Sequence, residues 1–196
     1  MSKIINKFVM YYKEWLNESS ISDLYTGTEL AFPSTTLRQH ATQPVIIKNI
    51  SWNAYKGLKT LFVKALAQNE DREYNPIILF KEISYQNFDG EISYDWDTGI
   101  ATEKNSVKIM TNIGRPYALN KVSLENNNVN LRCNCPDFRW RFSYYNHVDE
   151  SLYGRKPAKY HAMITNRPPV NPLELPGMCK HLIKFVEVLE KAGIFV

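Results

Sequence analysis

The sequence predicts an α+β fold in which two N-terminal helices and several antiparallel strands precede a small ββα unit. Three observations lead to this prediction. Two stretches near the N-terminus have apolar residues at helical spacing, the middle of the chain alternates short apolar runs with turns, and all three cysteines lie in two motifs in the last third. With 196 residues, the chain is long enough for one core or for two small lobes. We expect a division into residues 1–100 and residues 101–196.

The two predicted helices span residues 3–17 and 51–68. Each has an apolar stripe at steps of three and four residues, formed by Ile5, Phe8, Tyr12, Trp15 and Leu16 in the first and by Tyr55, Leu58, Leu61, Phe62 and Leu66 in the second. Ser51 is a suitable N-cap for the second helix. The first helix either packs on the core or docks on a partner protein. Residues 18–48 show no clear periodicity, so we expect a surface arm, or short strands that the pattern does not place.

Strands are predicted in the middle of the chain, where the apolar residues become continuous or alternate with polar ones. The predicted strands are residues 76–80, continued by alternation at 82–85, and residues 91–94, 106–111, 116–119 and 129–133. Asp89-Gly90 is a hairpin signal before residues 91–94. In the last strand, Val129, Leu131 and Cys133 share one face.

The composition limits the classes to which the chain can belong. It has no apolar run long enough to span a bilayer and no signal peptide, so we expect a protein that stays in a reducing compartment. Three cysteines are an odd number, which fits metal binding better than a disulfide framework. The net charge of +4 lies entirely after residue 128, where ten Lys and Arg face six Asp and Glu. This bias is too mild for the dense basic stripe of a strong nucleic-acid-binding protein.

The cysteine motifs predict a structural zinc site. Cys133 and Cys135 lie on one face of an extended chain, and Cys179 and His181 lie at the start of a predicted helix, so three thiols and one imidazole form a tetrahedral Zn²⁺ ligand set. Four protein ligands leave no position for a reactive water, so we expect no catalytic zinc and no enzyme activity. Three buried cysteines without metal are the alternative. His147 and His161, which lie within the 43 residues between the cysteine pairs, are rival ligands.

These motifs resemble the SWIM-type zinc finger, because Cys-x-Cys is followed by Cys-x-His, with Pro136 and Phe138 after the first pair and Lys-His-Leu after the second. The resemblance covers about the last third of the chain and implies Cys133, Cys135, Cys179 and His181 as the zinc ligands. It makes residues 101–196 a SWIM-like zinc-binding domain with a long insertion, residues 139–176. SWIM domains are DNA-binding or protein-interaction modules. The wording of the two motifs also resembles, more loosely, a variant in proteins of tailed bacteriophages.

The segment between the cysteine pairs is the candidate partner-binding region. Aromatic residues alternate with arginine or serine over residues 138–144, which predicts a strand with the aromatics on one face and the arginines on the other. A basic and then proline-rich stretch follows. Three interpretations stay open: the aromatics cover the zinc site as core, or the segment binds protein, or it binds single-stranded nucleic acid. The candidate contact residues are Arg139, Trp140, Arg141, Arg155 and Lys156.

Two functions follow from these expectations. The first is a non-enzymatic structural protein of a large assembly, for which the resemblance suggests a bacteriophage virion, with other protein subunits as partners. The second is a SWIM-type DNA- or RNA-binding protein. We expect no membrane partner and no small-molecule substrate. We expect the protein in the host cytoplasm during assembly and then in the virion if it belongs to a phage, and otherwise in the cytoplasm, not secreted.

Overall fold

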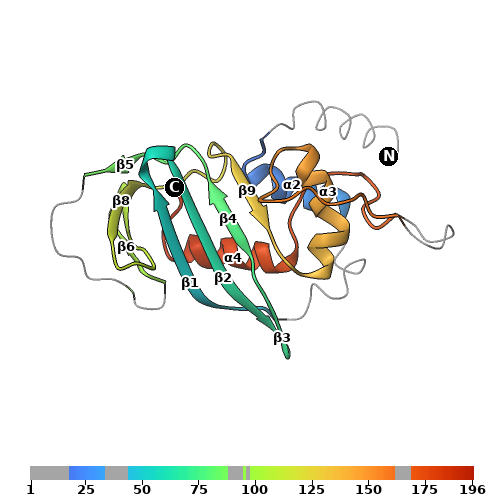
Figure 1. Cartoon of the computed structure of the whole chain (residues 1–196), viewed down its shortest axis with the longest axis horizontal. Helices are drawn as coiled ribbons and strands as arrows, with labels where there is room; N and C mark the ends of the chain where they lie inside the picture. The colour runs from blue at the N-terminus through green and yellow to red at the C-terminus, as the bar shows by residue number, and fades with distance from the viewer. Residues whose placement is uncertain (1–17, 34–43, 88–94, 96–97, 162–168) are drawn as a thin grey trace.

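The computed structural model describes residues 18–33, 44–87, 95, 98–161 and 169–196. The predicted helix at residues 3–17, the predicted turn at Asp89 and the predicted strand at residues 91–94 lie outside the described residues. Helices and two antiparallel sheets make up the described chain (Figure 1), which confirms the mixed helix-and-sheet class. None of the helices among the described residues combines the length and the apolar character needed to cross a bilayer.

The larger sheet has five strands in the order β1-β2-β4-β9, with β3 paired to β2. These strands are β1 (Ile46–Tyr55), β2 (Thr60–Asn69), β3 (Arg72–Tyr74), β4 (Ile77–Phe80) and β9 (Val129–Arg132). The strands predicted at residues 76–80 and 129–133 are confirmed as β4 and β9. Because β4 and β9 pair directly, strands from both sides of residue 100 lie in one sheet. The predicted division of the chain at that residue stays a prediction.

The helix predicted at residues 51–68 is wrong, because these residues form most of the β1–β2 hairpin. Its turn is a short 3-10 helix, η2 (Lys56–Leu58), followed by Lys59 in the left-handed region at φ 51°. In β2, Leu61, Val63, Ala65 and Ala67 are buried and their neighbours are more exposed, which is the period of a half-buried strand. Leu61, Phe62 and Leu66 satisfy helical spacing too, so the pattern alone fits both structures. Pairing of β2 with strands on both sides decides between them.

The smaller sheet has four strands in the order β5-β8-β7-β6. They are β5 (Tyr85–Gln86), β6 (Ile100–Thr102), β7 (Ser106–Met110) and β8 (Pro116–Asn120). The strands predicted at residues 106–111 and 116–119 are confirmed as β7 and β8. The strand predicted at residues 82–85 is shorter than expected and begins at Tyr85, and β6 was not predicted.

Helix α2 (Ile21–Ala31) corrects the expectation of an arm or of strands for the segment that contains it. Its N-terminus has a complete capping box: the Asp23 backbone N–H donates to Ser20 Oγ at 3.2 Å, and the Ser20 backbone N–H donates to the Asp23 carboxylate at 3.0 Å. This pair is a sequence signal for a helix start. It is easily missed because the helix has only a weak apolar stripe, with Gly27 and Thr28 among its buried residues.

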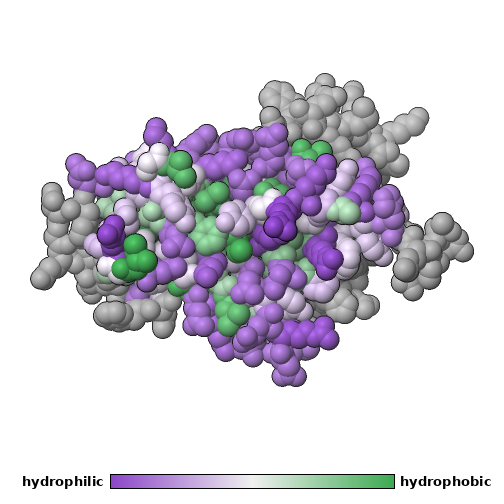
Figure 2. All heavy atoms as spheres, viewed as in Figure 1, coloured by the Kyte–Doolittle hydropathy of each residue, from purple (hydrophilic) through white to green (hydrophobic). Residues whose placement is uncertain are grey.

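The core lies between the larger sheet and helix α4 (Lys180–Lys191), which runs across one face of the sheet and packs on β1 and β2 (Figure 1). Leu182, Phe185 and Leu189 of α4 are fully buried. Residues of both sheets, of α2 and of α4 belong to the same buried cluster. On the face seen in Figure 2, apolar residues gather over the middle of the larger sheet within a polar rim.

Candidate metal centre

The first pair of cysteines is positioned by β9. Val129, Leu131 and Cys133 point to the same side and are buried, which confirms the predicted alternation. The chain then turns, and the backbone N–H of Phe138 donates to Cys135 Sγ at 3.3 Å. Hydrogen bonds of this kind hold a thiolate in place and favour its charge. The turn therefore presents both sulfurs to the inside of the molecule.

The second pair is positioned by the start of α4. Cys179 is the N-cap residue, in extended conformation, and His181 lies in the first turn. This placement agrees with the sequence prediction. The first turn of a helix has unpaired backbone N–H groups and a partial positive charge, which stabilise nearby thiolates.

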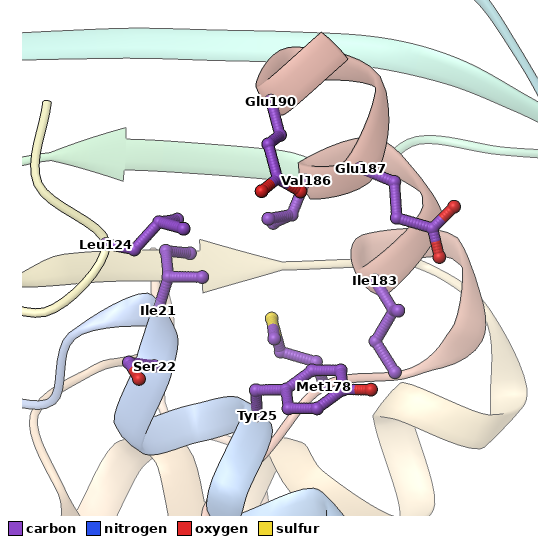
Figure 3. A pocket seen from close by; sticks show the side chains of 9 residues that line it. All are labelled: Ile21, Ser22, Tyr25, Leu124, Met178, Ile183, Val186, Glu187 and Glu190. Atoms are coloured by element: carbon purple, nitrogen blue, oxygen red, sulfur yellow. The ribbon is translucent and has the colours of Figure 1, made fainter. Parts of the chain in front are cut away.

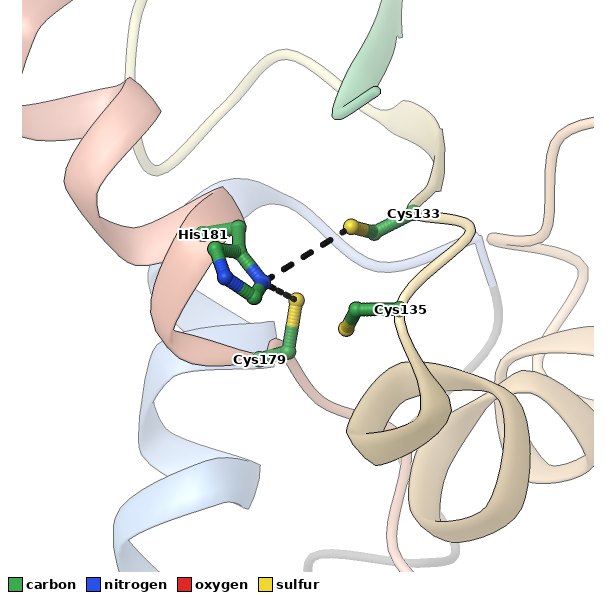
Figure 4. Close-up of side chains that lie close together, drawn as sticks. All are labelled: Cys133, Cys135, Cys179 and His181. Carbon is green, nitrogen blue, oxygen red and sulfur yellow. Dashed lines mark hydrogen bonds between the residues drawn. The ribbon is translucent and has the colours of Figure 1, made fainter. Parts of the chain in front are cut away.

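The four side chains meet in one buried cluster (Figure 4). Their ligand atoms all lie within 4.8 Å of one another. The Nδ1 atom of His181 lies 4.0 Å from Cys133 Sγ and 3.9 Å from Cys179 Sγ. Tetrahedral Zn–S bonds of about 2.3 Å place two ligand sulfurs about 3.8 Å apart, and a shorter Zn–N bond brings nitrogen slightly closer. The cluster therefore fits a metal ion after small movements of its side chains.

The imidazole of His181 offers Nδ1 to the cluster, so its other nitrogen carries the proton when a metal is bound. That nitrogen, Nε2, is buried and has no hydrogen-bond partner among the described residues. The ring of Tyr74, at the end of β3, lies against the imidazole with a centroid distance of 4.5 Å and an interplanar angle of 38°. Ring packing against Tyr74 and the rigid first turn of α4 therefore orient the imidazole, where many metal-bound histidines rely on a hydrogen bond.

Burial and mutual hydrogen bonds shift the pKa values of the three thiols in different directions. Hydrogen bonds from Cys133 and Cys179 lower the pKa of Cys135. Cys133 donates a hydrogen bond to Cys135, which raises the pKa of Cys133, and burial raises the pKa of Cys179. Cys135 is therefore the most acidic of the three thiols. A divalent cation supplies the charge that lets all three ionise together.

The rival histidines do not enter the cluster. His147 lies in helix α3 (Ser143–Val148), and His161 is exposed in the segment that follows. Among the described residues, the cluster that could hold a metal ion consists of Cys133, Cys135, Cys179 and His181. The ligand set that the sequence predicts is thus assembled, and the structure assigns no particular metal to it.

The predicted strand at residues 138–144 is wrong. This segment forms a π-helical turn, η3 (Phe138–Phe142), which continues into α3. Phe138 and Phe142 point into the core, whereas Trp140 is 42% exposed, so the aromatics do not share one face. Arg141 forms an ion pair with Asp137 one helical turn earlier, at 2.9 Å, which supports the helical form.

The predicted contact residues lie in two places. The guanidinium of Arg139 lies 4.5 Å from the centroid of the Trp140 ring, and Trp140 packs against Tyr160 at 5.2 Å. We call Arg139, Trp140 and Tyr160 the aromatic surface cluster. Arg141 lies over the ring of Phe32, with its guanidinium 5.0 Å from the centroid.

The remaining two contact residues follow Gly154. Arg155 and Lys156 are exposed, and the backbone oxygen of Arg155 accepts a hydrogen bond of 2.6 Å from Arg132, the last residue of β9. This second site is thereby attached to the strand that leads into the first cysteine pair.

Two buried asparagines position the second cysteine motif and were not predicted. Asn146 of α3 exchanges two hydrogen bonds with the backbone of Gly177, at 2.9 and 3.2 Å. Asn171 donates to the backbone oxygens of Arg141 and Leu175 at 2.9 and 2.8 Å. Asparagine is common in loops, so no sequence signal separates these two from the others. They hold the chain that delivers Cys179 against the helical segment that follows Cys135.

Gly177 is the other positioning residue, and its role is close approach. A Cβ atom on Gly177 would lie 2.5 Å from Thr28 Oγ1 and 2.9 Å from the ring of Phe142. The adjacent backbone N–H of Met178 donates to Thr28 Oγ1 at 2.7 Å. The chain before Cys179 is therefore clamped between α2 and η3.

Comparison with known proteins adds no relative, because no family model, no curated protein and no solved structure matches the chain. The family resemblance therefore rests on the two cysteine motifs and on the cluster that their residues form.

Proposed function

We propose that the protein is a non-enzymatic, zinc-binding structural protein whose metal site rigidifies an interaction module. The observation behind this proposal is that all four candidate ligands are buried. A catalytic zinc keeps an open coordination position for water or substrate, whereas a structural zinc takes four protein ligands. A closed set of three thiols and one imidazole belongs to the second class.

Zinc is the metal that this ligand set suits best. Thiolates are soft ligands and imidazole is a borderline one, and a tetrahedral arrangement of such ligands is typical of Zn²⁺. Hard cations such as Mg²⁺ and Ca²⁺ prefer oxygen ligands, and the cluster offers none.

The metal would join the two ends of the long segment between Cys135 and Cys179. Between Cys135 and Cys179 the described chain forms η3 and α3, and residues 169–178 are held against them by hydrogen bonds of Asn146 and Asn171. The aromatic surface cluster belongs to this segment. Lys159 adds to the same surface: it forms an ion pair with Glu174 at 2.9 Å and lies over the rings of Tyr144 and Tyr145.

The partners we propose are protein subunits of a larger assembly, and the sequence resemblance suggests a bacteriophage particle. Exposed aromatic residues next to arginine are enriched in protein interfaces. Trp140 and Tyr160 are 42% and 39% exposed, and Leu58, at the tip of the β1–β2 hairpin, is 75% exposed. These residues are the first candidates for contacts with neighbouring subunits.

Nucleic-acid binding is the second candidate, favoured by the stacking of Arg139 on Trp140. Exposed aromatics beside cations bind single-stranded nucleic acid by stacking on its bases and contacting its phosphates. Arg155 and Lys156 would supply further phosphate contacts.

Metal analysis tests the main proposal. The purified protein should contain one zinc per chain, and Cys179→Ser should lose it, because three ligands hold the ion far more weakly than four. His147→Ala and His161→Ala are matched controls that should keep the full zinc content. Removal of zinc with a chelator should lower the melting temperature sharply, because a structural zinc contributes on the order of 10 kcal/mol to folding. A metal-free protein with an unchanged melting curve would contradict the proposal.

Binding measurements separate the two candidate partners. If the surface binds single-stranded nucleic acid, log K should fall with log salt, and Trp140→Ala should lower the affinity by about 1–3 kcal/mol. If it binds protein subunits, the protein should co-purify with assembled particles, and Trp140→Ala should reduce its incorporation while DNA affinity stays negligible. Ile113→Ala is the control, because Ile113 is a 72% exposed apolar residue between β7 and β8 that is not among the proposed contact residues.

A further inference from the structure

The larger sheet uses one of its two faces for the core. Helix α4 packs on that face, and the strands cross in front of it in Figure 1. Alternate residues of the strands point to the opposite face, which is turned to the viewer in Figure 2. These residues are half-buried or exposed, in contrast to their buried neighbours. We call this surface the outer sheet face, and its central residues are Phe62, Lys64, Ile77, Leu79, Asn130 and Arg132.

Two aromatic rings lie together on the outer sheet face. Phe62 of β2 lies opposite Leu79 of β4, in the middle of the sheet. Tyr153 belongs to the chain that runs beside β9, where a parallel bridge joins Leu131 to Leu152. The centroids of the two rings are 5.4 Å apart, with 53° between their planes. Both residues are half-buried, so together they form a partly exposed aromatic surface.

A row of cations lies next to this aromatic pair. Lys64 lies opposite Ile77, and Ile77 lies opposite Arg132, so the two cations belong to one row across the sheet. Neighbouring strands are about 4.8 Å apart, which puts the Cα atoms of Lys64 and Arg132 about 10 Å apart. Lys64 also lies two residues from Phe62 on the same strand, a distance of about 7 Å. Aromatic rings and cations therefore lie at short spacing on one surface.

The border of the outer sheet face adds further positive charge. Lys48 of β1 is exposed on the same face, and Arg155 and Lys156 are exposed beyond β9. Two acidic residues lie near this border, Glu73 on β3 and Glu150 before the bridge beside β9. Together with the two cations of the row, the surface thus has five basic residues against two acidic ones. It is therefore a basic surface, although the chain as a whole is only mildly basic.

An apolar groove elsewhere on the molecule has the opposite charge. It has a volume of about 290 Å³ and lies between α2 and α4, where Glu187 and Glu190 line it (Figure 3). Lys184 pairs with Glu187 at 2.7 Å, which leaves these three side chains with a net negative charge. Tyr25, on the α2 side of the groove, is 44% exposed. This groove repels a polyanion, so Tyr25 is a suitable control for an exposed aromatic residue that takes no part in binding one.

We propose that the outer sheet face binds single-stranded nucleic acid, with bases stacked on Phe62 and Tyr153 and phosphates bound by Lys64 and Arg132. Every base has a flat face that stacks on an aromatic ring, and neighbouring cations bind the backbone. Antiparallel sheets with aromatic residues on an open face bind single-stranded RNA in this way. The proposal rests on the second candidate function, nucleic-acid binding, and assigns it to a surface other than the aromatic surface cluster. It does not depend on the metal.

Fluorescence anisotropy with labelled oligonucleotides tests the ligand class. The full-length protein should bind oligothymidylate and oligouridylate of about 20 nucleotides more tightly than a duplex of the same length, because only the single strands offer bases for stacking. Log K should fall linearly with log salt for both single strands. Equal or tighter binding of the duplex would overturn the proposal, as would binding to phosphatidylserine vesicles without binding to either single strand.

Phe62→Leu tests stacking, because leucine keeps an apolar side chain in the sheet and removes the ring. Its affinity for oligothymidylate should be about 5- to 100-fold lower than that of the wild type, which is the effect of losing one stacked base. Tyr25→Ala should bind as the wild type does. Both variants should keep the wild-type circular dichroism spectrum and zinc content, which shows that the fold and the metal site are intact. An unchanged affinity of Phe62→Leu would contradict the proposal.

Lys64→Ala tests the charge. The slope of log K against log salt should become less steep by about 0.7, the contribution of one phosphate contact on a single strand. Lys104→Ala, which removes an exposed cation between β6 and β7, should leave the slope unchanged. An unchanged slope for Lys64→Ala would count against the outer sheet face.

The same measurements separate this proposal from the functions proposed above. If Trp140→Ala weakens binding while Phe62→Leu and Lys64→Ala do not, nucleic acid binds at the aromatic surface cluster, so the second candidate function stands and the present proposal fails. If no oligonucleotide binds, both fail, and zinc content still tests the structural role.

Discussion

At the scale of single residues, the candidate metal centre is the part of this protein that the sequence predicts best. Cys133 and Cys135 lie two residues apart on an extended chain, so their side chains point to the same side. Cys179 and His181 lie at the helix start after Gly177 and face them. These are local rules, so a few residues suffice to apply them. The asparagines that support the site, Asn146 and Asn171, act on backbone atoms up to 31 residues away and have no local signature.

The ring of Tyr74 is the residue-scale feature with the clearest consequence. It packs on His181, whose Nε2 has no hydrogen-bond partner among the described residues. We expect Tyr74→Ala to weaken metal binding by about tenfold, at the lower end of what the loss of a supporting contact does at metal sites. Tyr74→Phe keeps the ring and should bind as the wild type does. Competition with a chromophoric chelator measures both, and equal losses in the two variants would show that the hydroxyl matters instead of the ring.

At the scale of elements, prediction succeeded for one helix and several strands and failed for residues 51–68 and 138–144. Helix α4 and strands β4, β7, β8 and β9 have patterns that fit one structure only. Residues 51–68 satisfy both periods, and sheet pairing selects the strand. Residues 138–144 alternate like a strand, but the π-helical turn lets Phe138 and Phe142 enter the core together. A single sequence contains no information on which pairing partners are available.

Gly177 provides a test at this scale, because three elements meet around it. We expect Gly177→Ala to destabilise the protein by about 1–3 kcal/mol, the usual penalty of overpacking, since its Cβ would overlap Thr28 of α2 and Phe142 of η3. Metal affinity should fall as well, because Cys179 follows two residues later. Gly57→Ala is the matched control: a Cβ at Gly57 meets nothing within 4 Å, so stability should change little. Urea unfolding measures both variants.

At the scale of the whole molecule, the buried cluster is continuous. It includes Trp52 and Ile78 of the larger sheet, Ile109 of the smaller sheet, Leu24 of α2 and the ligand Cys179. Strand pairing between β4 and β9 joins the two regions that the sequence divides at residue 100. A small single core of this kind commonly unfolds in one cooperative step.

We therefore expect thermal unfolding in a single transition, with and without zinc, and a lower midpoint without it. Far-ultraviolet circular dichroism and tryptophan fluorescence should give the same midpoint, since Trp52 and Trp140 report on opposite sides of residue 100. Two transitions, of which only the later-numbered region responds to a chelator, would instead support independent units on either side of that residue.

The distance along the chain between the two cysteine motifs also sets the delay between their synthesis in the nascent chain. Forty-three residues separate Cys135 from Cys179, which begins the second pair. At about 5–20 residues per second, the ribosome needs roughly 2–9 s for that interval. During that interval, the thiols of Cys133 and Cys135 have only half of the ligand set, and the rest of the fold does not yet shield them from oxidants. Cells short of zinc, or exposed to peroxide, should accumulate the protein with Cys133 and Cys135 oxidised, even though the finished fold buries both.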